Sequence, residues 1–226
     1  MKTTLLLVLA VFAPASLIAG DVVGTVVARG AGDSGGGGDK YASRKFKFVE
    51  RVEYEALRDF VVSVEGPGPA APAGAPRAAP VVVQKGALFS PRILPVAAGT
   101  VVEWPNDDDI FHNVFSISEA KEFDLGLYKH PEVKRVTFDR PGRVDILCSI
   151  HTQMSAVVLV LENPFFAKSD DAGRFAIRGL PAGRYTLRAW HERLPSVRRE
   201  VVVPAEGEVK VEFVLGPGGV PAAPTP

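Results

Sequence analysis

Hydrophobic residues along this chain fall in short runs, rich in β-branched and aromatic side chains, that alternate with polar residues. Gly, Pro, Asn and Asp separate the runs at short intervals. Alternation with a period of two turns one face of a segment to a core and the other to solvent, as in β-strands. The pattern therefore predicts an all-β protein, and only residues 45–59 have a pattern compatible with a helical turn. The expected strands cover residues 22–27, 59–66, 81–86, 100–104, 112–118, 133–142, 144–148, 155–162, 173–180, 183–190, 199–203 and 209–215.

The first twenty residues have a different pattern, with Lys2 before an apolar run that ends in small residues. This is the build of a secretory signal peptide, so we expect residues 1–20 to be a signal and the protein to be exported, with the periplasm as its destination. Pro14 interrupts the run, and no uninterrupted apolar stretch of about 20 residues occurs in the chain. We therefore expect no stable membrane span in the mature chain.

Charge and cysteine content narrow the function classes. Lys and Arg total 26, as do Asp and Glu, so the basic excess of a nucleic-acid-binding protein is missing. The chain has one cysteine, Cys148, and an intramolecular disulfide is excluded. In an oxidising compartment, this thiol is buried, paired with another chain, or chemically employed.

The residues around Cys148 favour a chemical role for its thiol. In the segment CSIHTQM, Cys148, His151 and Met154 follow one expected strand and precede another. Copper that exchanges single electrons takes a thiolate, two imidazoles and a weak axial ligand such as Met. His112, which starts the expected strand FHNVFS, supplies the second imidazole. Each of these residues alone has ordinary structural roles, but their combination favours a metal site. Zinc also binds His₂Cys sets, but a thioether is a poor zinc ligand, so the presence of Met154 favours copper.

Residues 81–161 resemble the cupredoxins, the small blue copper proteins. The resemblance rests on FSPRILPVAAGTVVEWPNDD, FHNVFS, VTFDRPG and a C-x2-H-x2-M loop similar to those of amicyanins. It implies one type 1 copper ion, with His112, Cys148 and His151 as equatorial ligands and Met154 as the axial ligand. It also implies that Asn113 is an outer residue whose hydrogen bonds tie the two ligand loops together.

The same resemblance implies a single-electron carrier that cycles Cu(II)/Cu(I), exchanges electrons with a redox protein and is not an enzyme. Electrons would leave through the exposed edge of His151. The surrounding apolar contact patch would comprise Ile110, Phe111, Ile150 and Thr152. The acidic run 107–109 either steers a basic partner or is a solvated turn.

The last part of the chain, DDAGRFAIRGLPAGRYTLRAW, resembles the carboxypeptidase regulatory-like family of prealbumin-like β-sandwiches. That family begins with strands that are absent just upstream but match DVVGTVVARG and RDFVVSVEG near the start of the chain. We therefore expect a cupredoxin Greek-key sandwich inserted into a split, smaller prealbumin-like sandwich; in the alternative, the early strands extend the cupredoxin sheet. The expected divisions are a signal peptide (1–20), the first prealbumin-like strands (21–66), a Pro/Ala/Gly linker (67–78), the cupredoxin (79–162), the remaining prealbumin-like strands (163–216) and a disordered tail (217–226).

Two other functions stay open. The site can serve copper capture or sensing without a redox partner, or the prealbumin-like part can bind a protein or glycan while copper is structural. The remaining histidines, His130 in a polar loop and His191 at the end of a strand, are not expected to bind metal. With four histidines and one cysteine, a multicopper oxidase, a copper nitrite reductase or a dinuclear centre bridged by two cysteines is excluded.

Overall fold

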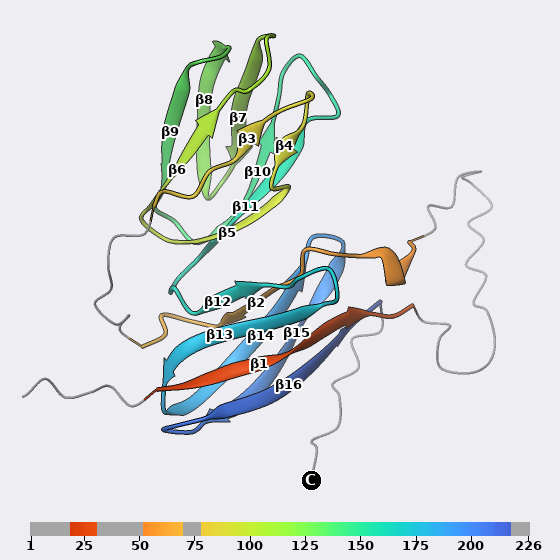
Figure 1. Cartoon of the computed structure of the whole chain (residues 1–226), viewed down its shortest axis with the longest axis vertical. Helices are drawn as coiled ribbons and strands as arrows, with labels where there is room; N and C mark the ends of the chain where they lie inside the picture. Colours follow the sequence, from red (N-terminus) through yellow and green to blue (C-terminus); the bar gives the residue numbers. More distant parts are fainter. Residues whose placement is uncertain (1–18, 31–51, 70–77, 218–226) are drawn as a thin grey trace, which may run out of the picture.

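The computed structural model describes residues 19–30, 52–69 and 78–217 (Figure 1). The regular structure of these residues is sixteen β-strands and one 3-10 helix, η1 (Tyr54–Ala56), so the prediction of an all-β fold is confirmed. The helix lies inside the segment for which a helical turn was expected. Most of the predicted signal peptide, linker and tail, residues 1–18, 70–77 and 218–226, lie outside the described residues.

The strands from β3 to β11 form the first sandwich, seen in the upper part of Figure 1. A five-stranded sheet in the order β5-β11-β10-β7-β8 faces the pairs β6-β9 and β3-β4. The strands are β3 (Val83–Gln84), β4 (Phe89–Ser90), β5 (Ile93–Ala97), β6 (Thr100–Pro105), β7 (His112–Ser118), β8 (Lys121–Tyr128), β9 (Val133–Phe138), β10 (Gly142–Leu147) and β11 (Ser155–Leu161).

The core of the first sandwich is built from the inward positions of both layers. Trp104 on β6 and Phe138 on β9 have no exposed surface, and their rings lie 6.4 Å apart. Val144 and Ile146 on β10 complete the opposite wall and are also fully buried. Since burial of one such side chain stabilises a fold by about 1.5–3 kcal/mol, this core fixes the ends of β7 and β10 relative to each other.

The remaining strands form the second sandwich, in which a sheet ordered β13-β1-β16 packs on one ordered β12-β2-β14-β15. β1 lies between its neighbours, antiparallel to β13 and parallel to β16. β1 begins at Ala19, so the last two residues of the predicted signal peptide pair with Leu180 and Pro181. The strands are β1 (Ala19–Ala28), β2 (Val61–Val64), β12 (Phe166–Lys168), β13 (Arg174–Pro181), β14 (Gly183–His191), β15 (Leu194–Val203) and β16 (Glu208–Leu215).

The chain leaves the second sandwich after β2 and returns at β12, which pairs with β2. Asn163 fastens the two crossings together: its side-chain N–H groups donate to the main-chain oxygens of Val64, at 2.9 Å, and Gly66, at 2.7 Å. Its Oδ1 accepts from the N–H of Phe165. Asn163 is buried, and a side chain at Gly68 would collide with it. The exit and the return of the chain are thus held side by side.

The contacts between the two sandwiches include a small apolar cluster and an ion pair. Val61 and Trp190 of the second sandwich pack against outward residues of β5 and β11, namely Ile93, Val157 and Leu159. Beside this cluster, Arg92 donates two hydrogen bonds to Glu192, at 2.9 and 3.1 Å. Among the described residues, none of the helical structure is long and apolar enough to cross a membrane.

Candidate metal centre

The loop before β7 places His112. Asn106, at the end of β6, donates through Nδ2 to the main-chain oxygens of Ile110 and Tyr128, both at 3.0 Å, and accepts the N–H of Asp108. An Asn side chain that bonds the backbone two residues on is a turn-forming device, so the PNDDD segment folds back tightly here. His112 follows this turn and is completely buried.

The loop between β10 and β11 places the other three predicted ligands. Leu147 pairs with Ser155, so Cys148 and Met154 are the first and last residues of a hairpin loop. Both are buried in the core of the first sandwich, while His151 at the loop's middle is half-buried. The N–H of Met154 donates to the main-chain oxygen of His151 at 3.0 Å, which closes the loop into a turn.

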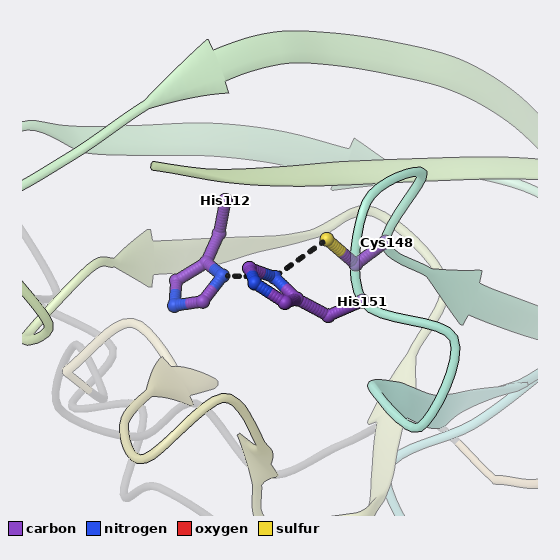
Figure 2. Close-up of side chains that lie close together, drawn as sticks. All are labelled: His112, Cys148 and His151. Atoms are coloured by element: carbon purple, nitrogen blue, oxygen red, sulfur yellow. Dashed lines mark hydrogen bonds between the residues drawn. The ribbon is translucent and has the colours of Figure 1, made fainter. Parts of the chain in front are cut away.

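Three of the predicted residues meet at this end of the sandwich (Figure 2). The Nδ1 atoms of His112 and His151 lie 3.0 Å apart, and Cys148 Sγ lies 3.8 Å from His151 Nδ1. One ligand atom from each of the three residues lies within 4.8 Å of the others. Met154 adjoins them as the last residue of the same loop.

These separations fit a shared ion. A first-row metal with bonds of about 2.0 Å to nitrogen and 2.3 Å to sulfur, at angles near 110°, holds two nitrogens roughly 3.3 Å apart and nitrogen and sulfur roughly 3.5 Å apart. The distances from His151 Nδ1 to His112 Nδ1 and to Cys148 Sγ are close to these two values. The donor types, two imidazoles and one thiol beside a thioether, are those that copper takes in electron-transfer sites.

Asn113 ties β7 to the cysteine loop through its main chain. Its N–H donates to Cys148 Sγ at 3.5 Å. The side chain of Asn113 donates to Asp124 on β8 at 2.7 Å. β8 pairs with β7, which brings Asp124 within reach of the Asn113 side chain. The N–H of Gly126 and the Asn113 amide both donate to the Asp124 carboxylate, and these hydrogen bonds hold its pKa below its usual range.

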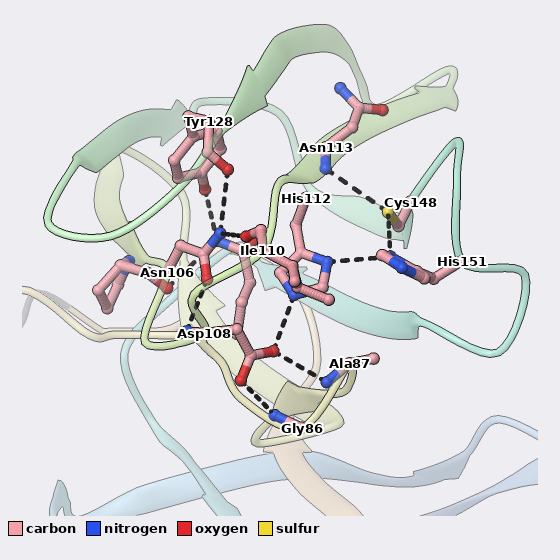
Figure 3. A network of polar contacts seen from close by, with 12 residues as sticks. Gly86, Ala87, Asn106, Asp108, Ile110, His112, Asn113, Tyr128, Cys148 and His151 are labelled. Carbon is pink, nitrogen blue, oxygen red and sulfur yellow. Dashed lines mark hydrogen bonds and ion pairs between the residues drawn. The ribbon is translucent and has the colours of Figure 1, made fainter.

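Sequence reasoning missed the role of Asp108, which was weighed only as part of a steering run or a solvated turn. Its Oδ2 lies 2.8 Å from Nε2 of His112, on the ring edge away from Cys148 (Figure 3). The N–H groups of Gly86 and Ala87, in the turn between β3 and β4, donate to the same carboxylate. Burial raises the pKa of Asp108, but these N–H groups and His112 together outweigh it and hold the pKa below its usual value. The signal available in the sequence was an acid four residues before a ligand histidine.

The predicted contact patch lies at the surface near this site. Ile110, Phe111 and Ile150 each keep about half of their surface exposed, and Thr152 is exposed as well. The ammonium of Lys129 lies 5.4 Å from the centre of the Phe111 ring. Ile110 and Phe111 precede His112 in the sequence, and Ile150 and Thr152 flank His151.

The other two histidines lie apart from the cluster. His130 is exposed in the connection between β8 and β9, and His191 ends β14 in the second sandwich. His191 is buried, packs on the ring of Phe60 at 5.0 Å and accepts the N–H of Arg193 through Nδ1. Its surroundings give it a structural role.

We expect stability to fall at acid pH through His191. Burial lowers its pKa below the ordinary value of 6.5, against the opposing charges of Glu192 and Asp59. Below pH 6.5 the unfolded chain therefore binds a proton that the folded chain excludes, so stability is complete above this pH and is lost as the pH falls. Chemical denaturation between pH 7.5 and 5 checks this: His191→Gln should flatten the pH dependence, whereas His130→Gln should leave it unchanged. Equal slopes for His191→Gln and the natural protein would contradict it.

No protein-family model matches this sequence, and no curated protein matches it. Solved structures similar to it include a Cu-containing nitrite reductase from Thermus scotoductus SA-01, with 30% identity over 42% of this chain and a TM-score of 0.37. The match spans 25% of the nitrite reductase chain. A reduced Cu(I) form of an amicyanin variant has 24% identity over 44% of this chain and 97% of its own, with a TM-score of 0.35. A purple cupredoxin from Nitrosopumilus maritimus has 27% identity over 36% of this chain and 98% of its own, with a TM-score of 0.32.

Proposed function

We propose that this protein is an exported type 1 copper protein that carries single electrons. The observation that carries the proposal is the meeting of His112, Cys148 and His151 within 4.8 Å at one end of a β-sandwich. These residues would hold one copper ion through two Nδ1 atoms and the thiolate, with Met154 as the axial ligand. Copper supplies the one-electron Cu(II)/Cu(I) couple at such a site.

The protein's own contribution is a rigid, dry ligand set. His112 and Met154 are at most 1% exposed and Cys148 is 7% exposed, so water has little access to them. The N–H of Asn113 donates to Cys148 Sγ and helps to hold the sulfur in place. A set fixed on two β-strand ends changes little between oxidation states, which keeps electron exchange fast.

His151 connects the site with the surface. It is half-buried, and Ile110, Phe111 and Ile150 around it are exposed. A redox protein that covers these apolar side chains would approach the imidazole edge without an intervening water layer.

The proposed organisation is a copper sandwich, residues 79–162, inserted into a split prealbumin-like sandwich of residues 21–66 and 163–216. The pairing of β1 with β13 and β16, and of β2 with β12 and β14, supports the split. The hydrogen bonds from the Asn163 side chain to Val64 and Gly66 support the insertion boundary. Export of the mature chain through the signal 1–20 is part of the same proposal, and N-terminal sequencing of protein from the native host tests it.

The spectrum of the mature protein after addition of Cu(II) tests the copper site. We expect an intense absorption band in the red part of the visible spectrum and a narrow copper hyperfine splitting in paramagnetic resonance, because a thiolate binds the ion directly. A colourless complex would contradict a type 1 site. An equimolar titration with Zn(II) is the control for adventitious binding, since it occupies the site without colour.

Electron exchange separates the carrier from a protein that captures or senses copper. A carrier reduces reversibly at a fixed potential and exchanges electrons rapidly between its two oxidation states. Tight Cu(I) binding with slow exchange would instead support capture. Full biological function after Cys148 or Met154 is replaced in the native host would support a structural copper site beside a protein- or glycan-binding sandwich.

A further inference from the structure

The carboxylate of Asp108 is a polar group at the candidate metal centre that the ligand set does not use. Its Oδ2 lies 2.8 Å from Nε2 of His112, and only 16% of its side chain is exposed. His112 itself is fully buried, so water does not replace this contact. We propose that Asp108 is a positioning residue that fixes the tautomer of His112 and lowers the reduction potential of the bound copper.

The tautomer follows from the acceptor character of the carboxylate. An ionised carboxylate only accepts hydrogen bonds, so Nε2 of His112 carries the proton and Nδ1 keeps its lone pair. That lone pair points to the cluster, where Nδ1 of His151 lies 3.0 Å away. In the metal-free protein, His151 therefore donates its Nδ1 proton to His112. A hydrogen-bonded second partner of this kind fixes the ring orientation of a metal-ligating histidine.

The carboxylate is itself held in place by main-chain donors. The N–H of Gly86 reaches Oδ1 at 2.7 Å, and the N–H of Ala87 reaches Oδ2 at 2.9 Å. Ala87 has a φ of 54°, a left-handed conformation that a non-glycine residue rarely adopts. The strained turn between β3 and β4 therefore directs two N–H groups at Asp108. These two hydrogen bonds hold the carboxylate so that its Oδ2 faces His112.

The effect on potential rests on the proposed function. A negative carboxylate that accepts the Nε2 proton makes the imidazole a stronger electron donor, and this stabilises Cu(II) more than Cu(I). Loss of the charge should therefore raise the reduction potential. Asp107 and Asp109 carry the same charge in the same loop, but neither has a hydrogen bond to His112 among the described contacts.

The first experiment uses the metal-free, full-length mature protein and needs no copper. Nitrogen-15 NMR of the imidazoles should show His112 protonated at Nε2 and bare at Nδ1. The Asp108→Asn side chain has one acceptor oxygen and one donor amide group in place of two acceptor oxygens. It can no longer accept from both the Gly86 and Ala87 N–H groups and from His112 in one orientation, so we expect a mixture of His112 tautomers. A Nδ1-protonated His112 in the natural protein would overturn the proposal whether or not the site binds copper.

The second experiment measures the potential of the copper-loaded protein. Asp108→Asn should shift the ratio of Cu(I) to Cu(II) affinities at least tenfold toward Cu(I), equivalent to about 59 mV for one electron. Asp109→Asn is the matched control and should shift it much less, because it removes the charge without a bond to His112. Equal shifts in both variants would mean that Asp108 acts through its charge alone, and this would overturn the positioning role. A colourless natural protein would refute the proposed function, while the NMR result would still decide the tautomer.

Discussion

Replacement of Cys148 by serine is expected to abolish the intense visible band of the copper-loaded protein. The band requires a thiolate bonded to Cu(II), and a hydroxyl neither ionises at neutral pH nor transfers charge to the metal in this way. Cu(II) affinity should fall by more than the roughly 10–100-fold that loss of a residue hydrogen-bonded to a ligand costs, since Cys148 would bind the ion itself. Absorption spectra and competition titrations with a chelator of known affinity measure both effects.

The fold should survive this substitution. Cys148 is a small buried side chain whose Sγ accepts the N–H of Asn113, and a serine oxygen keeps an acceptor there, so the metal-free variant should lose only about 1 kcal/mol. Ser149→Ala, at the exposed neighbouring position, is the matched control and should keep its colour. An intense band that persists in Cys148→Ser would mean that the proposed ligand set is wrong.

A valine at Gly24 is expected to disrupt the second sandwich and leave the copper site intact. The Cβ would overlap the main-chain oxygen of Val211 on β16 and lie 3.1 Å from a ring carbon of Phe175, so β1 must move away from a strand it pairs with. Overpacking of this kind costs about 1–3 kcal/mol or more. For a unit of this size, a loss of about 2 kcal/mol lowers Tm by about 8–16 °C.

Calorimetry and amide hydrogen exchange assign this loss to one sandwich. Protection should fall in β1, β13 and β16, while the band of the copper-loaded protein should be retained. Val27→Ala, at an exposed position on the same strand, is the control and should change little. A loss of copper binding together with β1 pairing would contradict the proposal that the first sandwich is an independent insertion.

The strands with alternating β-branched residues could be predicted, but four strands at the edges of their sheets, β4, β5, β8 and β12, could not. β5 contains Pro95, which lacks an N–H and so weakens a strand pattern; its place at the edge of the five-stranded sheet tolerates this. β8, at the other edge, carries charged residues and Gly126 between its apolar positions. Edge strands bury less surface, and their sequences therefore carry a weaker alternation.

The four candidate ligands could be proposed from spacing because three of them share one short loop. The fourth, His112, was proposed as a histidine at the start of another strand, and its approach to Cys148 depends on how β7 and β10 pair, which sequence spacing does not encode. The contacts of Asn113 and Asp108 were out of reach for the same reason. Asp108 is held by the turn of Gly86 and Ala87, more than twenty residues upstream, and no local pattern joins these segments.

The parallel pairing of β1 with β16 joins segments from opposite ends of the chain. β1 must wait, without this neighbour, until the β16 segment has been synthesised. The first sandwich has mostly nearer contacts and can form earlier, and once formed it brings Val64 and Asn163, 99 positions apart, within hydrogen-bonding distance. Loop closure then costs far less entropy for the strands that remain. Maturation in the cell should accordingly proceed from the middle of the polypeptide outward, with the termini docking last.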